Sequence, residues 1–227
     1  MNHFWKIDLH AHSSWSRDCL VPLETIIQIC SVRGINRIAI TDHNTIEGAK
    51  LAKGLAPNLI IIGEEIMTSQ GELLGYFLQE TVPPGLSPQR TIELLRDQGA
   101  IISVAHPFDR LRRGSWSTSE LLRIVDQIDA IEIFNAGCPF LASNHKAQIF
   151  AAQHHLLGTV GSDAHIPQAY GRAVLCGKPF SGPLEFLEFI RGASIVEGTF
   201  PPYFHLFSHY AKWLKKLRLK RRYWPGG

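Results

Sequence analysis

Residues 8–18 read DLHAHSSWSRD and begin within a predicted strand over residues 4–9. Side chains alternate along a strand, so His10 and His12 point the same way and can bind one cation together. A single His-x-His pair is weak evidence, because such pairs also occur in chains that bind no metal. The interpretation therefore depends on whether other strands end in similar residues.

Four further predicted strands end in histidines or acids. The segments are TDHNT (41–45), GEE (63–65), AHP (105–107) and GSDAH (161–165). The carboxyl ends of parallel strands meet on one face of a barrel, so we expect these side chains to lie close together. Imidazole combined with carboxylate suits Zn²⁺, Mn²⁺ or Fe²⁺, whereas an all-oxygen shell for Ca²⁺ does not fit. The sequence thus predicts a metal site.

Strands alternate with helices along most of the chain, which indicates βαβ units and a parallel sheet in one α/β domain. Several strands are almost entirely apolar, which favours a sheet covered on both faces. The predicted strands span residues 4–9, 37–41, 59–63, 100–105, 130–134 and 157–161, with weaker candidates at 73–78 and 173–177. One predicted helix begins at Pro22. A second has Ser87 as its cap and Pro88 at its first position, leading into residues 91–98, and two more span residues 119–127 and 142–154.

The composition narrows the class of protein. The chain has 227 residues and 45% hydrophobic content, which is enough for one full core. No segment approaches the roughly 20 apolar residues of a membrane helix, and the first residues lack a secretory signal pattern. The four cysteines form no CxxC pair and no disulfide framework. We therefore expect reduced thiols and a cytoplasmic protein without a transmembrane segment.

Charge is unevenly distributed. Residues 212–222 contain seven Lys and Arg and no acid, which leaves 16 basic and 20 acidic residues elsewhere. We expect a main domain over residues 1–200 and a basic amphipathic C-terminal helix or tail over residues 201–227. The tail has three interpretations: a helix packed on the barrel, an RNA-backbone contact, or attachment to an anionic surface. The apolar face of this helix is predicted to contain Phe204, Phe207, Tyr210, Ala211, Leu214 and Leu217.

Six stretches in a fixed order resemble the PHP family, named for polymerase and histidinol phosphatase. They are DLHAHSSWSRD (8–18), TDHNT (41–45), GEEIMTS (63–69), SVAHP (103–107), IEIFNA (131–136) and GSDAH (161–165). The resemblance covers most of residues 7–172. It implies a distorted (β/α)7 barrel that hydrolyses phosphate esters with two or three divalent ions, Mn²⁺, Zn²⁺ or Fe²⁺.

The resemblance also implies eight metal ligands. The first ion is expected on His10, His12, Glu65 and Asp163, and the second on Asp18, His43 and His165. Glu65 also reaches towards a third ion, whose other expected ligand is His106.

Three features of the sequence modify this assignment of ligands. Glu64 is expected to face away from Glu65 and to be structural. Asn135 or Cys138 stands where members with a full third site usually have a histidine, so the third site is expected to be weak or empty. Cys19 replaces the usual glycine after the Asp18 ligand.

Other side chains are expected to assist. Asp8 and Asp42 adjoin ligating histidines and are predicted to accept their second ring N–H, or else simply to bond the local backbone. Catalytic roles are expected for His106, Asp163 and His165, with His106 as general acid if the third site is empty. The predicted phosphate-binding residues are Arg110, Asn135 and Arg172, with Arg112 and Arg113 in the next loop. The alternative to phosphate binding is that each of these arginines is an ordinary charged side chain that faces solvent.

The expected reaction is hydrolysis by a hydroxide that the metal ions activate. The expected substrates are nucleotides or short RNA, as in a nucleoside 3′,5′-bisphosphate phosphatase or a 5′–3′ exoribonuclease. About 40 residues separate Glu65 from His106, which leaves no room for an inserted lid and predicts an open site. The alternatives are a histidinol-phosphate-type phosphatase for small molecules and a regulatory module with reduced catalysis. An amidohydrolase is disfavoured because no strand ends in a bridging lysine.

Overall fold

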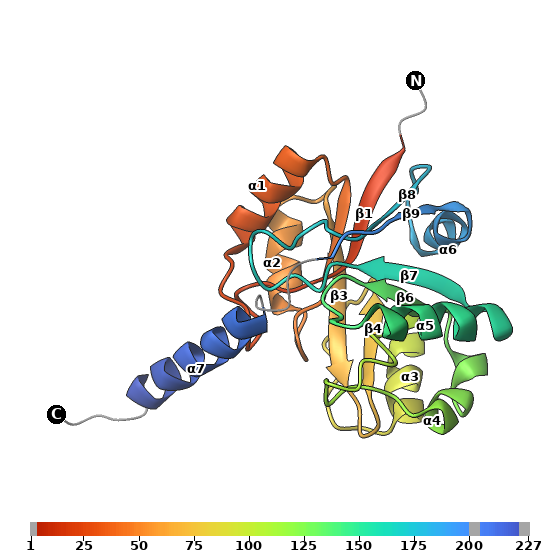
Figure 1. The fold of residues 1–227 in the computed structure, drawn as a ribbon. Helices are drawn as coiled ribbons and strands as arrows, with labels where there is room; N and C mark the ends of the chain where they lie inside the picture. Colours follow the sequence, from red (N-terminus) through yellow and green to blue (C-terminus); the bar gives the residue numbers. More distant parts are fainter. Residues whose placement is uncertain (1–3, 200–204, 223–227) are drawn as a thin grey trace.

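A computed structural model describes residues 4–199 and 205–222, which form strands and helices in mixed order (Figure 1). The elements are β1 (Trp5–Ala11), α1 (Leu23–Arg33), β2 (Arg37–Ile40), α2 (Glu47–Leu55), β3 (Ile60–Met67), β4 (Glu72–Tyr76), α3 (Pro88–Asp97), β5 (Ile101–Val104), α4 (Thr118–Leu122), a 3-10 turn η1 (Val125–Gln127), β6 (Ala130–Asn135), α5 (Leu141–Gln153), β7 (Leu157–Gly161), β8 (Val174–Gly177), α6 (Pro183–Gly192), β9 (Ser194–Val196) and α7 (His205–Arg222).

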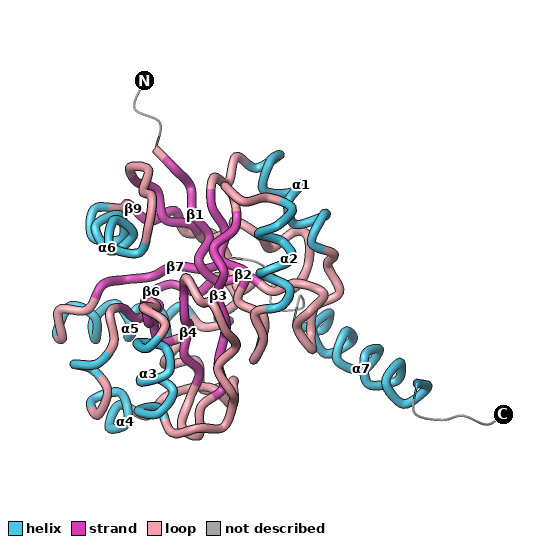
Figure 2. Tube along the Cα trace, turned by 180° about the vertical axis from the view of Figure 1, so that it is seen from behind, coloured by secondary structure: helices cyan, strands magenta, loops and turns pink. Residues whose placement is uncertain are grey.

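The strands form one sheet in the order β7-β6-β5-β4-β3-β2-β1-β8-β9, which curls round on itself (Figure 2). β1 and β7 meet where Ala11 bridges Ala164 in parallel. Two hydrogen bonds close this seam: the N–H of His12 donates to the Ala164 carbonyl at 3.1 Å, and the N–H of Asp163 donates to the His10 carbonyl at 2.7 Å. The sheet is therefore a nearly closed barrel, as the sequence predicts.

The predicted parallel sheet is wrong at β4, which pairs antiparallel with both β3 and β5. It is also wrong at β8, which pairs antiparallel with β1 and β9. β3 runs on to Met67, and only residues 68–71 separate it from Glu72 at the start of β4. A parallel return needs a crossover of a dozen or more residues, so this short turn forces a hairpin. β4 consequently begins at the barrel end where β3 and β5 finish.

Local sequence explains the helix boundaries. The Ser87 hydroxyl accepts the N–H of Arg90 at 3.2 Å, and Pro88 occupies the first turn, so α3 begins where the sequence predicts. The helix predicted over residues 119–127 is instead short α4 followed by η1. A capping box between Ser117 and Glu120 begins α4.

Helices cover the outside of the barrel, and α6 covers one end. The ring of Phe186 on α6 is fully buried and packs edge-on against Tyr76, with ring centroids 5.7 Å apart. Tyr76 ends the antiparallel strand β4, so it lies at the barrel end opposite the ends of β1, β2 and β3. That other end is free for a functional site.

α7 contacts the barrel near its first turns and then projects from it (Figure 1). Lys215 Nζ donates to the Ser14 carbonyl at 2.6 Å and also to the Ser16 carbonyl. Ala211 is buried and Leu214 is half-buried.

The predicted apolar face of this helix is covered only in part. Phe207, Tyr210 and Leu217 are all exposed. Phe204 and the predicted boundary at residue 200 lie outside the described residues. Within the described part of the chain, no helix combines the length and apolar character needed to cross a membrane.

Candidate metal centre

The structure brings the eight predicted ligands together at one end of the barrel, from β1, β3 and the segments that follow β1, β2, β5 and β7. His12 lies near the middle of this group. Its Nε2 is 3.3 Å from His10 Nε2, 3.3 Å from Glu65 Oε2 and 3.3 Å from Asp163 Oδ1. All four of these side chains are fully or almost fully buried. Residues 150 positions apart thus share one small volume.

Four sets of ligand atoms each lie within 4.8 Å of one another. Neighbouring sets share members, as expected for cations close together. The sets are His10, His12 and Asp163; His12, Asp18, His43 and His165; His10, Glu65 and His106; and His43, Glu65 and Glu72.

Two observations test whether these donors fit divalent metal ions. Glu65 Oε2 and Asp163 Oδ1, which both face the other donors, are buried without a hydrogen-bond partner among the described residues. The 3.3 Å between His10 Nε2 and His12 Nε2 matches two imidazole ligands on one tetrahedral ion, about 3.3–3.4 Å for bonds of about 2.0–2.1 Å. The donor set therefore fits a metal of the Zn²⁺, Mn²⁺ or Fe²⁺ class.

The electrostatics of the site favour positive charge. Burial acts to lower the pKa of His10, but Glu132, Glu65 and Asp163 raise it well above its ordinary value. Burial acts to raise the pKa of Glu65, but His43 and His10 lower it well below the ordinary range. Protons on the histidines and cations thus compete for the same carboxylates, so metal binding releases protons.

Glu132 on β6 orients His10. One carboxylate oxygen is 3.0 Å from His10 Nδ1, and the other accepts the His106 N–H at 2.8 Å and the Asn135 side-chain amide at 2.9 Å. This bond directs His10 Nε2 towards the other ligands. Sequence reasoning missed Glu132, although a single acid inside the apolar strand IEIFNA is a signal for an inward carboxylate.

Asp8 and Asp42 are buried beside the site but do not bond the histidine rings, so that part of the prediction is wrong. Asp8 accepts the N–H and hydroxyl of Ser162 at 2.9 and 2.5 Å, and the N–H of Gly171 at 2.8 Å. Asp42 accepts the N–H and hydroxyl of Ser13 at 2.5 and 2.6 Å. Their short side chains reach the neighbouring loops, and so they fix the loops that carry ligands.

The three predicted phosphate-binding residues lie elsewhere than expected. Arg110 and Arg172 are exposed and do not line the cavity beside the site. Arg172 Nε donates instead to the Gln168 carbonyl at 3.2 Å. Asn135 is fully buried, and its amide donates to Asp163 Oδ2 at 3.2 Å.

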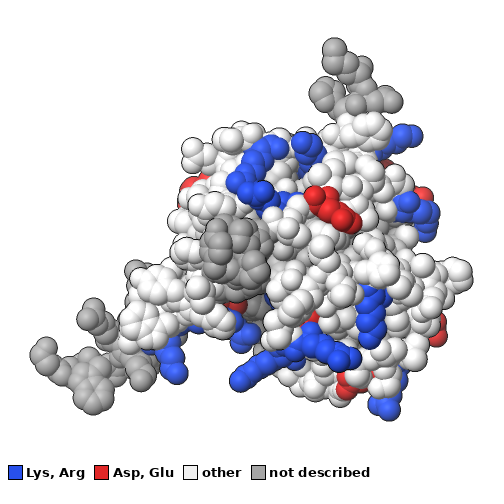
Figure 3. Space-filling model, in the orientation of Figure 1, with Lys and Arg blue, Asp and Glu red and all other residues white. Residues whose placement is uncertain are grey.

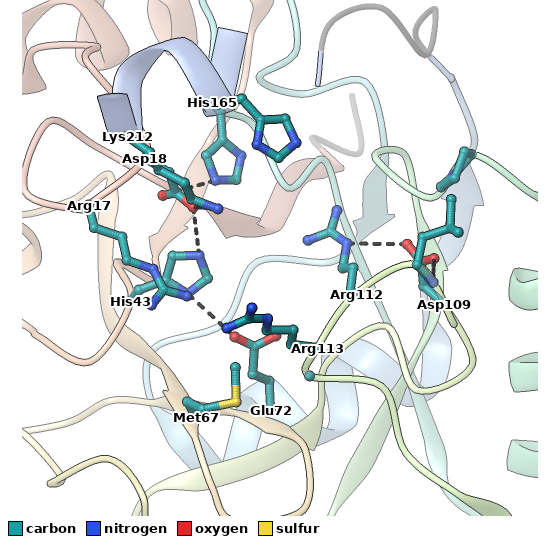
Figure 4. A pocket seen from close by; sticks show the side chains of 14 residues that line it. Arg17, Asp18, His43, Met67, Glu72, Asp109, Arg112, Arg113, His165 and Lys212 are labelled. Carbon is teal, nitrogen blue, oxygen red and sulfur yellow. Dashed lines mark hydrogen bonds and ion pairs between the residues drawn. The ribbon is translucent and has the colours of Figure 1, made fainter. Parts of the chain in front are cut away.

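Arg112 takes the place expected of Arg110. The buried carboxylate of Asp109, three residues earlier, accepts the Arg112 Nε–H at 3.2 Å (Figure 4). This bond turns the guanidinium inwards, where Nη2 pairs with Asp163 Oδ2. Burial acts to raise the pKa of Asp163, but Arg112 and His10 hold it well below its ordinary value. Asp163 Oδ2 is therefore held by Arg112 and Asn135, while Oδ1 stays available to a cation.

Glu72 is the second acid that sequence reasoning missed. Its carboxylate oxygens lie 3.6 Å from His43 Nδ1 and 3.5 Å from His106 Nε2. Burial and the nearby charge of Glu65 raise the pKa of Glu72, because burial and a like charge both disfavour the ionised form. The missing signal was the direction of β4, since only an antiparallel strand places its first residue at this end.

Known proteins resemble this chain in sequence. A family model described as the PHP domain matches residues 8–105, and one described as PHP-associated matches residues 142–194. Uncharacterized protein MJ0417 of Methanocaldococcus jannaschii is 35% identical over 196 residues, which is 82% of this chain and 79% of that protein. The chain belongs to the PHP family. The family expected from the six ordered motifs is thus confirmed.

Solved structures resemble the PHP chain in fold. A two-domain protein from Bacteroides vulgatus, described as containing a predicted PHP-like metal-dependent phosphoesterase, has a TM-score of 0.68 at 19% identity. The match covers 86% of this chain and 65% of that one. PfuEndoQ, a lesion-specific endonuclease from Pyrococcus furiosus, has a TM-score of 0.61 at 16% identity, covering 88% and 60% of the two chains.

The metal site of this PHP chain opens into a cavity of about 570 Å³. Acids and histidines form its floor, and side chains of both basic and apolar type form its walls (Figure 4). The basic wall residues are Arg17, Arg112, Arg113 and Lys212, and the apolar ones are Met67, Leu111 and Pro139.

Two residues of the site have positive φ angles that L-residues rarely adopt: His106 at 23° and Asp163 at 51°. Both angles direct a side chain from a strand end into the site. Such strain is kept where surrounding contacts hold it, and here Glu132 and Arg112 supply those contacts.

Proposed function

We propose that this PHP chain is a metal-dependent phosphoesterase that cleaves phosphate esters of nucleotides or short nucleic acids. One observation carries the proposal: eight histidines and carboxylates converge below a cavity whose wall holds three arginines and a lysine. The donors suit divalent metal ions, and the wall suits an anionic substrate.

The ligand sets suggest how cations would be held. His10, His12 and Asp163 would hold one ion, Asp18, His43 and His165 a second, and Glu65 would reach both. Glu72, 3.5 Å from His106 Nε2, would add a donor to a third position, for which members with a full third site usually supply a histidine after the sixth strand. When bound, such ions generate a nucleophile from water at neutral pH and neutralise charge on phosphate oxygens.

The side chains of this PHP chain have separate tasks in this proposal. Arg112 fixes Asp163 and faces the cavity, where its guanidinium can bond phosphate oxygens. Arg17 and Arg113 add positive charge on the same wall. His106 and His165 serve the reaction as ligands, since Glu65 and Asp18 already hold their Nε2 atoms at 2.7 and 3.3 Å.

The shape of the cavity favours a nucleotide over a smaller ester. A volume of about 570 Å³ exceeds what one phosphate needs, and Met67, Leu111 and Pro139 offer apolar surface for a base. The fold likeness to PfuEndoQ, described as a lesion-specific endonuclease, supports a nucleic-acid substrate. No lid domain is inserted between β3 and β5, so the cavity is accessible to a longer chain.

The test is hydrolysis by protein reloaded with Mn²⁺ after removal of bound metal. The substrates are a nucleoside 3′,5′-bisphosphate, 5′-phosphorylated RNA and histidinol phosphate. We expect turnover of the first or second, abolished by chelator and in a His10→Ala, His12→Ala double variant. Turnover of histidinol phosphate alone would overturn the nucleotide substrate, and no turnover despite bound metal would favour a regulatory module.

A further inference from the structure

The C-terminal helix α7 supplies part of the cavity wall. His209 and Lys212 line the cavity, and Lys212 Nζ lies 3.3 Å from Asp18 Oδ2. The bonds of Lys215 to the Ser14 and Ser16 carbonyls fix the helix on the loop that leads to Asp18. Both matched family segments end before this helix, at residues 105 and 194. α7 therefore lies outside both matched segments and reaches the metal site.

Three stripes run along α7, because residues three or four apart share a helix face. Ala211 and Lys215 form the stripe that faces the barrel. His209, Lys212 and Lys216 form a basic stripe that starts at the cavity.

The third stripe is apolar and adjoins the basic one. It consists of Leu206, Tyr210, Trp213 and Leu217, which are 67%, 54%, 57% and 40% exposed. The rings of Tyr210 and Trp213 are stacked, with centroids 6.1 Å apart.

Positive charges are crowded along one face of α7. Lys212 and Lys216 are four residues apart on one face, a spacing at which like charges destabilise a helix. Residues 212–222 contain seven Lys and Arg and no acid. Basic side chains also gather on the barrel face next to α7 (Figure 3). A chain of phosphates along this face would relieve the repulsion and release counterions.

We propose that α7 is a binding platform for single-stranded nucleic acid whose end enters the metal cavity. Lys212 and Lys216 bind backbone phosphates, and the rings of Tyr210 and Trp213 stack on bases. Cations beside exposed aromatic rings are the pattern of sequence-independent single-strand binding. The inference rests on the proposed function for the identity of the substrate, and it makes an oligonucleotide a better substrate than a mononucleotide.

An anionic membrane is the rival occupant, since a helix with aromatic and basic stripes also lies at lipid surfaces. The attachment of α7 argues against it. Lys212 and His209 point into a phosphoesterase cavity, so the basic stripe continues into the site that cleaves phosphate esters. A chain of phosphates can occupy the cavity and the basic stripe at the same time.

The test measures binding and hydrolysis separately, on the full chain loaded with Mn²⁺. Binding uses the fluorescence anisotropy of a labelled 12-nucleotide single-stranded RNA, and hydrolysis compares that RNA with a nucleoside 3′,5′-bisphosphate. The variants are Trp213→Ala and Lys216→Ala. Lys178→Ala is the control, because Lys178 is exposed on the loop after β8.

We expect Trp213→Ala to weaken RNA binding about fivefold or more, since stacking contributes about 1–3 kcal/mol per base. Lys216→Ala lowers the slope of log affinity against log salt by about 0.7, the value for one phosphate of a single strand. Both variants leave the turnover of the mononucleotide unchanged. The control Lys178→Ala leaves RNA binding and turnover unchanged. RNA affinity equal to that of the native chain in both variants overturns the proposal.

A vesicle assay distinguishes the membrane alternative. If Trp213→Ala and Lys216→Ala lose binding to phosphatidylserine vesicles while RNA binding is unaltered, α7 is a membrane anchor and the proposal fails. Failure of the proposed function has a different signature, because RNA then binds through α7 but no phosphate ester is cleaved.

Discussion

A single carboxylate on β6 holds three groups of the site. Glu132 contacts His10 Nδ1, the backbone N–H of His106 and the amide of Asn135. It touches no group that lines the open cavity. Its effect on the chemistry therefore acts through the orientation of His10.

Replacement of Glu132 tests this orientation. We expect Glu132→Gln to lower metal affinity about 10- to 100-fold, because an amide cannot accept hydrogen bonds at both ends. Competition with a chelator measures the affinity. Glu188→Gln, an exposed acid on α6, is the matched control. An affinity unchanged in Glu132→Gln would show that His10 keeps its direction without this bond.

Glu72 gives a prediction about the number of ions bound. Glu72 lies close to His43 and His106. Glu72→Gln is therefore expected to lower the affinity for one ion about tenfold or more and to leave the affinity for the other ions unchanged. Metal analysis after gel filtration at a series of free Mn²⁺ concentrations gives the count. Glu80→Gln, exposed after β4, should retain the native count. A uniform loss of all ions contradicts a separate position for Glu72.

Glu64 predicts how stability depends on pH. It faces away from the site, accepts the Val82 N–H at 2.9 Å, and burial raises its pKa to about 8. The folded state then keeps a proton that the unfolded chain loses above about pH 4.5. The free energy of unfolding should therefore fall between about pH 4.5 and 8, by up to about 1.4 kcal/mol per pH unit.

Urea unfolding at pH 5 and pH 8 in chelator checks the Glu64 prediction. Glu64→Gln should flatten the decline, whereas Glu80→Gln should not. Equal slopes in the native chain and Glu64→Gln would mean that Glu64 is ionised when folded.

At this scale the sequence predicts the eight ligands, because each adjoins a strand end in a motif of fixed order. It does not predict partners that depend on long-range packing. Glu132 lies in mid-strand, and Arg112 faces inwards only because Asp109 turns it. Arg110 and Arg112 cannot be distinguished from spacing alone.

At the scale of elements, the sequence locates most strands but not their directions. Strand positions follow from apolar runs, whereas the direction of β4 depends on the length of the turn before it. The seam between β1 and β7 is equally invisible in the sequence, since it joins residues about 150 positions apart. Both features decide which side chains reach the metal end.

Gly161 permits the close approach of β1 and β7. A Cβ there would collide with the side chain of His10 and lie 2.8 Å from its backbone nitrogen. We expect Gly161→Ala to lower the free energy of unfolding by about 1–3 kcal/mol, the usual cost of overpacking. Metal affinity should fall as well, because His10 is displaced.

Thermal unfolding and chelator competition measure the two effects. Gly54→Ala is the control of opposite sign: Gly54 lies within α2 with open space round it, so alanine should stabilise by about 0.5–1 kcal/mol. If Gly161→Ala retains native stability, the seam is looser than the contacts imply.

At the scale of the whole molecule, cations would connect parts of the barrel that the backbone joins weakly. The ligands come from β1, β3 and the segments after β1, β2, β5 and β7. A bound ion is therefore a cross-link between the two halves of the sheet. Binding only to the folded state must stabilise it.

We expect Mn²⁺ at 100 times its dissociation constant to stabilise the fold by about 2.7 kcal/mol. For a chain of this size that corresponds to a rise of about 5–10 °C in Tm. Differential scanning fluorimetry of chelator-treated protein checks the shift. The control is KCl of equal ionic strength without divalent cations. A Tm that is identical with and without Mn²⁺ would contradict a metal site built from distant strands.

The seam between β1 and β7 also has a consequence for protein synthesis. His10 and His12 are translated before their partners Asp163 and His165, which lie about 150 residues later in the sequence. A nascent polypeptide cannot assemble the centre until the ribosome has released that late segment. The complete centre thus forms only after this late segment is available, and a product that ends before it carries histidines without their carboxylate partners.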